Sequence, residues 1–168
     1  MIKLNKHKTK NFLIALTVMT TLVAVDQIIK YFVELKLKPI TESPLIPGFL
    51  QLHYHRNDGA MMGFLEGKTT LVTVLSILCM IALILLMFTD VIKTKLDYIC
   101  LVMIATGGIG NIIDRIFRGY VVDYIEYLFV DFYIFNFADC LITVGAFLLI
   151  FYQIYLMIKE TKAKKERG

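Results

Sequence analysis

Four long apolar stretches constrain the fold of this chain more than any other feature. A helix needs about 20 mostly apolar residues to cross the hydrocarbon core of a bilayer. The stretches that meet this requirement are residues 11–33, 69–89, 96–117 and 137–158. Hydrophobic residues make up 58% of the 168 residues and charged residues 19%, whereas a soluble domain is roughly 45–50% apolar. The sequence therefore predicts an all-α membrane protein, a four-transmembrane-helix bundle that forms a single domain over residues 1–168.

The basic residues predict the orientation of this bundle. They gather in the first and last ten residues, at Lys3, Lys6, Lys8, Lys10, Lys159, Lys162, Lys164, Lys165 and Arg167. Lys93 and Lys95 lie between the second and third stretches. Because basic flanks remain on the cytoplasmic side, we expect both termini in the cytoplasm and the first and third connections outside. Basic ends of this kind favour membrane lipid over nucleic acid as a partner. The first stretch lacks a small-residue cleavage site and is interpreted as a retained signal anchor.

The first connection, about residues 36–66, contains all three prolines and is therefore not helical throughout. After them, Leu50, Leu52 and Tyr54 alternate with polar residues, which is the period of a strand. The third connection contains a β-branched and aromatic segment at residues 120–125. These patterns predict a small extracytoplasmic antiparallel β-sheet that lies on the outer membrane surface.

Histidine and cysteine give little support for a metal site. His53 and His55 lie on one strand face, and a solvated face is favoured over a metal site because no further His or Cys supports one. Cys79, Cys100 and Cys140 each lie inside an apolar stretch and are predicted to be small buried hydrophobes. No histidine near Cys140 in the sequence could activate it as a nucleophile. We expect neither a metal nor a cofactor.

Polar residues gather at one depth of the predicted bundle. They lie at the outer ends of the first, third and fourth helices and in the two outer connections, at Asp26, Lys30, Asn57, Asp58, Asn111, Asp114, Arg115, Asp123, Asn136 and Asp139. Charged and amide groups inside a membrane are costly, so such a cluster needs either mutual pairing or a function.

Two ion pairs account for part of this cluster. Asp26 and Lys30 are four residues apart on one helix face. Asp114 is followed directly by Arg115. We interpret both pairs as ion pairs that hold helix ends together, with a direct role in function as the alternative.

Asp123 and Asp139 are left without an evident cationic partner. Two carboxylates that converge in a poor dielectric share a proton, as in the aspartic proteases. A proton relay in a small carrier would use the same residue types, but its acidic residues should line a path between the two faces. A helper subunit, whose polar pairs serve assembly alone, is a third alternative.

These motifs together resemble the lipoprotein signal peptidases (signal peptidase II), bacterial membrane aspartyl endopeptidases with four transmembrane helices. The resemblance covers residues 25–145 and preserves the order and spacing of the motifs. They are Asp26-Gln27 with Lys30, Arg56-Asn57-Asp58-Gly59-Ala60, the glycine-rich residues 107–115 that end in Gly-Asn-Ile-Ile-Asp-Arg, Val121-Val122-Asp123-Tyr124-Ile125, and Phe135-Asn136-Phe137-Ala138-Asp139.

The resemblance implies a function and a role for each matched residue. Asp123 and Asp139 would be the catalytic pair. Supporting or substrate-binding roles fall to Asp26, Lys30, Asn57, Gly59, Gly107, Asn111, Asp114, Arg115 and Asn136. The implied reaction is removal of the signal peptide from diacylglyceryl-modified prolipoproteins, on the N-terminal side of the modified cysteine.

The resemblance also implies a location and an inhibitor class. The enzyme would lie in the bacterial cytoplasmic membrane with its active site at the outer face, and globomycin-like cyclic peptides would inhibit it. We expect a monomer. The chain departs from the family where Met61 and Met62 follow Ala60 instead of a further alanine and an aromatic residue. This departure bears on how the loop packs over substrate and on substrate preference.

Overall fold

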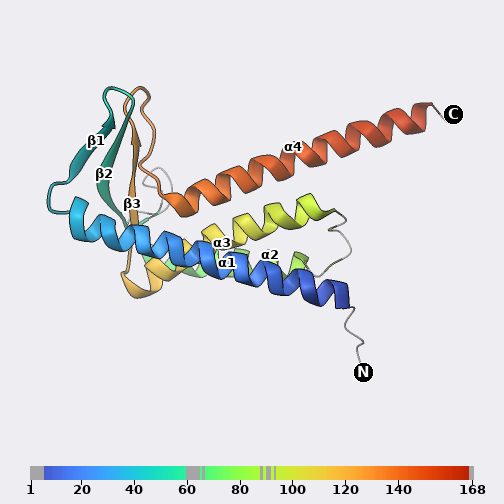
Figure 1. The fold of residues 1–168 in the computed structure, drawn as a ribbon, viewed down its shortest axis with the longest axis horizontal. Helices are drawn as coiled ribbons and strands as arrows, with labels where there is room; N and C mark the ends of the chain where they lie inside the picture. Colours follow the sequence, from blue (N-terminus) through green and yellow to red (C-terminus); the bar gives the residue numbers. More distant parts are fainter. Residues whose placement is uncertain are drawn as a thin grey trace.

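The computed structural model describes residues 6–59, 65, 67–87, 89, 92 and 94–166. Within these residues, four helices are long and apolar enough to cross a membrane, and one antiparallel sheet contains three strands (Figure 1). The elements are α1 (Lys6–Phe32), the π-helical turn η1 (Val33–Leu37), β1 (Glu42–Ile46), β2 (Leu50–Asn57), α2 (Thr69–Met87), α3 (Lys95–Phe117), β3 (Val121–Tyr127) and α4 (Phe137–Lys165). The predicted helices and strands are confirmed.

Two helices are longer than their apolar stretches predict. The first helix begins at Lys6 and continues through η1 to Leu37, whereas residues 11–33 were predicted. The fourth continues past residue 158 to Lys165. Four of its last seven residues are lysines, which are good helix formers although they are charged. Hydropathy therefore predicts the spans but not the full helices.

Helix α3 is the centre of the bundle and packs against α1, α2 and α4. Half of the residues in the most apolar part of α3 are buried, whereas the corresponding share is 17% or less in α1, α2 and α4. Its glycines permit this close packing. A Cβ at Gly107 would overlap the carbonyl oxygen of Ala138, and one at Gly110 would lie 2.8 Å from Oδ2 of Asp26. Any side chain at Gly107 or Gly110 would therefore push α3 away from α4 or from Asp26.

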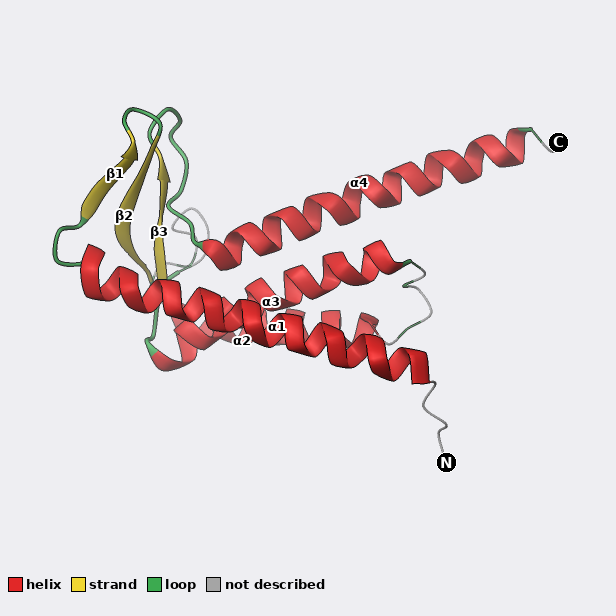
Figure 2. Cartoon of the chain, viewed as in Figure 1, coloured by secondary structure: helices red, strands yellow, loops and turns green. Residues whose placement is uncertain are grey.

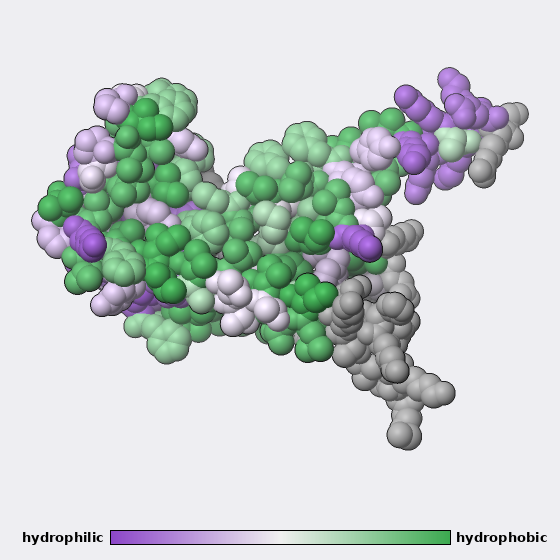
Figure 3. Space-filling model, viewed as in Figure 1, coloured by the Kyte–Doolittle hydropathy of each residue, from purple (hydrophilic) through white to green (hydrophobic). Residues whose placement is uncertain are grey.

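The outward faces of the helices are apolar. Figure 3 shows hydrophobic residues over the length of the bundle and hydrophilic residues gathered at the end of α4. Exposed side chains such as Leu85 and Phe151 fit a lipid environment. Cys79 is exposed on this surface, whereas Cys100 is buried and Cys140 partly buried. The prediction that all three cysteines are buried is therefore wrong for Cys79, because α2 presents most of its surface outward.

The sheet lies at one end of the bundle, with strand order β1-β2-β3 (Figure 2). Helix α1 begins and α4 ends at the opposite end of the bundle (Figure 1). Val122 and Tyr124 of β3 pack with Val33 and Leu37 of η1 in a small buried core. This packing fixes β3 against the C-terminal end of the first helix, and the residue between Val122 and Tyr124 is Asp123.

Candidate active site

Asp123 is buried in β3, with 1% of its surface exposed. Its Oδ1 accepts a hydrogen bond from Nδ2 of Asn136 at 2.6 Å, and its Oδ2 accepts one from Nδ2 of Asn57 at 2.8 Å. Burial, together with the nearby charge of Asp139, raises the pKa of this carboxyl to about 7. Asp123 therefore retains a proton at a pH where an ordinary aspartate is ionised.

Asp139 lies in the first turn of α4, where it forms a capping box with Asn136. The backbone N–H of Asn136 donates to Oδ2 of Asp139 at 3.1 Å, and the N–H of Asp139 donates to Oδ1 of Asn136 at 3.0 Å. Oδ1 of Asp139 accepts a further hydrogen bond from Nδ2 of Asn111 at 2.7 Å. Asn136 thus contacts both aspartates. Its side-chain nitrogen donates to Asp123, and its side-chain oxygen and backbone N–H form the capping box with Asp139.

Amides surround both of these carboxylates, and no cation among the described residues forms a salt bridge with either. Within the part of the chain that the structure describes, every salt bridge to an aspartate involves Asp26 or Asp114. In the same described ranges, neither Asp123 nor Asp139 takes part in a salt bridge. The separation predicted from the sequence is therefore found: one set of carboxylates is ion-paired, and the other is hydrogen-bonded by neutral groups.

Lys30 is the centre of the ion-paired set and is fully buried. Its Nζ lies 2.9 Å from Oδ2 of Asp26 and 2.9 Å from Oδ2 of Asp114. The same nitrogen donates to Oδ1 of Asn111 at 3.0 Å. Because Asn111 also donates to Asp139, the ion-paired set is joined to the second set through one amide.

The predicted pair of Asp114 with Arg115 is wrong. Asp114 instead accepts hydrogen bonds from Lys30 and from Arg118, the residue that follows the last turn of α3. Neighbouring residues on a helix point in different directions, whereas residues four apart share a face. Arg118 also donates from Nη1 to Oε1 of Gln27 at 2.9 Å and from Nε to Oε2 of Glu34 at 3.0 Å.

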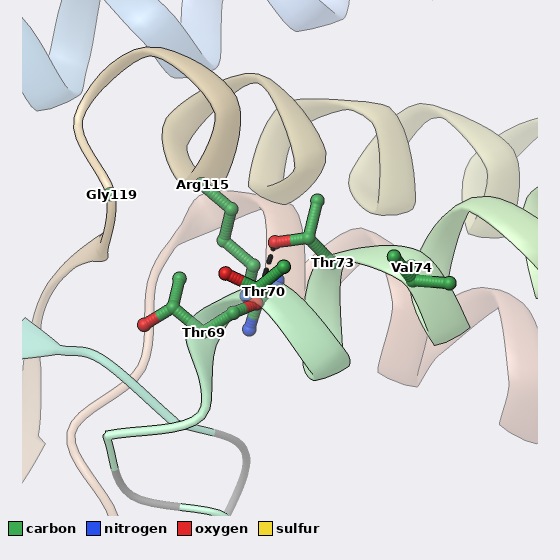
Figure 4. Close-up of a pocket in the computed structure, with 6 residues that line it drawn as sticks. All are labelled: Thr69, Thr70, Thr73, Val74, Arg115 and Gly119. Atoms are coloured by element: carbon green, nitrogen blue, oxygen red, sulfur yellow. Dashed lines mark hydrogen bonds between the residues drawn. The ribbon is translucent and has the colours of Figure 1, made fainter.

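Arg115 points the other way, into a cavity of about 390 Å³ between α2 and α3 (Figure 4). The cavity is lined by Thr69, Thr70, Thr73, Val74, Arg115 and Gly119. Nη2 of Arg115 donates to the carbonyl of Gly59 at 3.2 Å, and the N–H of Gly59 donates to Oδ1 of Asn57 at 3.1 Å. Arg115 therefore supports the segment after β2 that holds Asn57 against Asp123.

Comparison with known proteins decides the family. The family model for signal peptidase (SPase) II matches residues 18–155. This chain belongs to the signal peptidase II family. It is 36% identical over 144 residues to the lipoprotein signal peptidases of Staphylococcus aureus strains JH9 and Newman, which covers 84% of this chain and 86% of theirs.

Two solved structures are similar to this chain along most of its length. A bacterial membrane enzyme solved by the in meso method at 2.3 Å matches with a TM-score of 0.78 and 33% identity, over 92% of this chain and 93% of the other. A second, solved at 1.9 Å, matches with a TM-score of 0.74 and 33% identity, over 83% and 91%. The chain is therefore a multi-pass membrane protein, and the expected family is confirmed.

One hydrogen-bonded network in this chain contains nearly all the residues that the sequence singled out. It comprises Asp26, Lys30, Asn57, Gly59, Asn111, Asp114, Arg115, Asp123, Asn136 and Asp139. Sequence reasoning gave no role to Gln27, Glu34 and Arg118, although Arg118 lies at helical spacing from Asp114. Met61 and Met62 lie outside the described residues.

Proposed function

We propose that this chain is an aspartic endopeptidase that removes the signal peptide from diacylglyceryl-modified prolipoproteins. Asp123 and Asp139 would form its catalytic pair, and the cut would fall on the N-terminal side of the lipid-modified cysteine. The observation that carries the proposal is the meeting of two carboxylates at Asn136, held by amides, beside a separate set of carboxylates that is ion-paired. Membership of the signal peptidase II family supports the reaction class.

The raised pKa of Asp123 supports a mechanism in which the pair holds one proton near neutral pH. The ionised carboxylate takes a proton from water as the new C–O bond forms at the scissile carbonyl. The protonated carboxyl donates its proton to the carbonyl oxygen. As the C–N bond breaks, the newly protonated carboxyl gives its proton to the leaving amine. The other carboxylate takes a proton from a hydroxyl of the tetrahedral intermediate as the C=O bond re-forms, so the pair returns to its starting state. These steps use water and two carboxyl groups.

The asparagines position the two carboxyls in this mechanism. Asn57 and Asn136 donate to Asp123, and Asn111 donates to Asp139. Neutral amides orient a carboxylate without the strong bias toward ionisation that a cation imposes, so the shared proton stays available. Asp26, Lys30 and Asp114 then serve as a rigid support, and Arg115 holds Gly59, whose N–H donates to the side chain of Asn57.

We place the reaction at the outer membrane interface, with both termini in the cytoplasm. The substrate's acyl chains remain in lipid, so the bond to be cut lies near the end of the bundle. The candidate site lies at the same end as the sheet, opposite to the end where α4 finishes (Figure 1). A reporter fused after Gly168 should be cytoplasmic, and one inserted near Glu42 should be external; the reverse pattern would overturn this orientation.

The direct test is cleavage of a purified diacylglyceryl-modified prolipoprotein by the purified enzyme, with the unmodified precursor as the control substrate. We expect cleavage of the modified precursor alone. Asp123→Asn should abolish turnover while the protein still accumulates in membranes. Full activity in this variant would exclude the proposed pair, and equal cleavage of both precursors would exclude the proposed substrate class.

Inhibition gives a second test. A globomycin-like cyclic peptide should block cleavage by occupying the site as substrate does. If the enzyme cleaves the modified precursor but resists such a peptide, the proposed reaction stands. The resistance would then be attributed to the sequence departure at Met61 and Met62.

A further inference from the structure

Arg118 ends α3 and has no place in the motifs that the sequence singled out. Its backbone N–H donates to the carbonyl of Asp114 at 2.7 Å, which closes the last turn of the helix. Its side chain, 20% exposed, folds back along the helix so that Nη1 donates to Oδ1 of the fully buried Asp114. It therefore brings a positive charge from the edge of the protein to the ion-paired set.

Asp114 connects this charge to both members of the proposed catalytic pair. Its Oδ2 accepts a hydrogen bond from the backbone N–H of Val122 at 3.3 Å, directly before Asp123. The same oxygen lies 2.9 Å from Nζ of Lys30, which reaches Asp139 through Asn111. A displacement of Asp114 would thus move both the start of β3 and the side chain of Asn111, which donates to Asp139.

Arg118 also fixes the orientation of Gln27. Nη1 of Arg118 donates to Oε1 of Gln27 at 2.9 Å. With its oxygen held in this way, Gln27 directs Nε2 toward Oδ1 of Asp114 at 3.0 Å and Oδ2 of Asp26 at 3.2 Å. A reversed amide would place its oxygen against two carboxylates, which is unfavourable.

A third contact ties Arg118 to the segment that leads into β3. Its Nε donates to Oε2 of Glu34 in η1 at 3.0 Å, and Oε1 of the same carboxylate accepts from the hydroxyl of Tyr120 at 2.7 Å. Between Arg118 and Tyr120 lies Gly119, with a φ of +79°. Arg118 and Glu34 therefore hold the turn from which β3 starts.

From these contacts we infer that Arg118 is a positioning residue for the reaction, which acts through Asp114 and Gln27 on Asp123 and Asp139. The inference rests on the proposed function. Arg118 does not touch the reacting atoms, so its loss should lower kcat and leave KM nearly unchanged. A misplacement of catalytic groups by about 1 Å can cost on the order of 100-fold in rate.

The test is steady-state cleavage of the diacylglyceryl-modified precursor by single variants of the full chain. Arg118→Gln should lower kcat roughly 30-fold with KM within about twofold. Arg118→Lys keeps a cation beside Asp114 and Gln27 and should recover most of the lost kcat. Lys36→Gln removes the same charge from η1, where Lys36 lies over the ring of Phe32, and should match the wild type.

A double-mutant cycle that uses Glu34→Gln and Arg118→Lys gives a second test, which does not depend on the folding of Arg118→Gln. Glu34→Gln leaves the contact between Arg118 and Asp114 in place and should lower kcat about threefold. In the Arg118→Lys background the same change should have less effect, because the bond from Nε is already lost. A wild-type kcat in Arg118→Gln, a loss confined to KM, or a lysine variant no better than the glutamine variant would each overturn the inference. Failure of the wild type to cleave the precursor would instead overturn the proposed function.

Discussion

Two helices of this protein begin with the same capping box, and one of the two boxes lies at the candidate active site. At the start of α3, the N–H of Thr94 donates to Oδ2 of Asp97 at 3.2 Å, and the N–H of Asp97 donates to Oγ1 of Thr94 at 3.1 Å. At the start of α4, Asn136 and Asp139 repeat this arrangement. Both aspartates are held by a further amide, from Gln153 for Asp97 and from Asn111 for Asp139.

The difference between the two boxes lies in the capping residue. Once its oxygen caps the helix, an asparagine still has two N–H groups to donate, whereas a threonine has one hydroxyl hydrogen. Asn136 uses this amide to reach Oδ1 of Asp123 at 2.6 Å and Oδ1 of Asn111 at 3.2 Å. In the described part of the chain, the bonds of the Thr94 box end at Gln153. The two boxes thus differ in whether the capping residue also donates a hydrogen bond to a second carboxylate.

The largest expected difference is between the two capping aspartates, Asp139 and Asp97. Asp139→Asn should lower cleavage of the modified precursor by at least about 10³-fold, because the pair loses a group that takes or donates a proton. Asp97→Asn changes the same kind of box at the other end of the bundle and should leave kcat within about twofold. Equal losses in the two variants would show that activity depends on helix capping alone.

The next variant separates two contacts of Asn136, the helix cap and the hydrogen bond to Asp123. Asn136→Thr copies the box of α3 into α4, so the cap is retained and the amide is lost. We expect kcat to fall roughly 100-fold, an effect of the size seen when one donor is removed from a catalytic site. Thermal unfolding should change little. A variant with normal kcat would mean that the contact with Asp123 is dispensable.

A smaller effect concerns pH. An ordinary aspartate has a pKa near 3.8, and burial together with the charge of Asp139 raises the pKa of Asp123 to about 7. If the singly protonated pair is active, kcat/KM should fall about tenfold per unit above pH 7, as the shared proton is lost. The hydrogen bond from Asn136 lowers this pKa, so Asn136→Thr should move the alkaline limb to higher pH. A limb that stays in place would contradict this role of the amide.

The smallest effect is expected at Gln153, which donates to Oδ1 of Asp97 at 2.7 Å. Gln153→Ala should lower the free energy of unfolding by about 1–2 kcal/mol, because the buried carboxylate loses a hydrogen bond. Denaturation in detergent would measure this loss, and the cleavage assay should show an unchanged kcat. Reduced activity without reduced stability would count against a purely structural role for the α3 box.

Hydropathy and period-two alternation predicted most of this fold from the sequence. The apolar stretches at residues 69–89 and 96–117 correspond closely to α2 and α3, and the alternation from Leu50 gave β2. These signals succeed because burial in lipid or against a sheet follows directly from side-chain type. The π-helical turn η1 has no such signal, since its five residues read as an ordinary end of a helix.

The candidate site was predictable in its residues but not in all of its partners. Asp123 and Asp139 stood out because the nearby cations could be assigned elsewhere, and the structure agrees that neither is ion-paired among the described residues. The assignment of Arg115 to Asp114 failed because neighbouring residues in a helix point in different directions, whereas residues four apart lie on the same face. Glu34 could not have been found, since its approach to Arg118 depends on how η1 meets the end of α3.

The length of α4 affects the depth at which the candidate active site would lie in the bilayer. Its 29 residues rise about 43 Å at about 1.5 Å each, whereas the hydrocarbon core is about 30 Å thick. Its first turn is held in place, since the N–H of Ala138 donates to Oδ1 of Asp26 at 3.2 Å. A thinner or thicker bilayer would therefore be accommodated at the lysine-rich far end, which can overhang or tilt, and the carboxyl pair would keep its level relative to the headgroups.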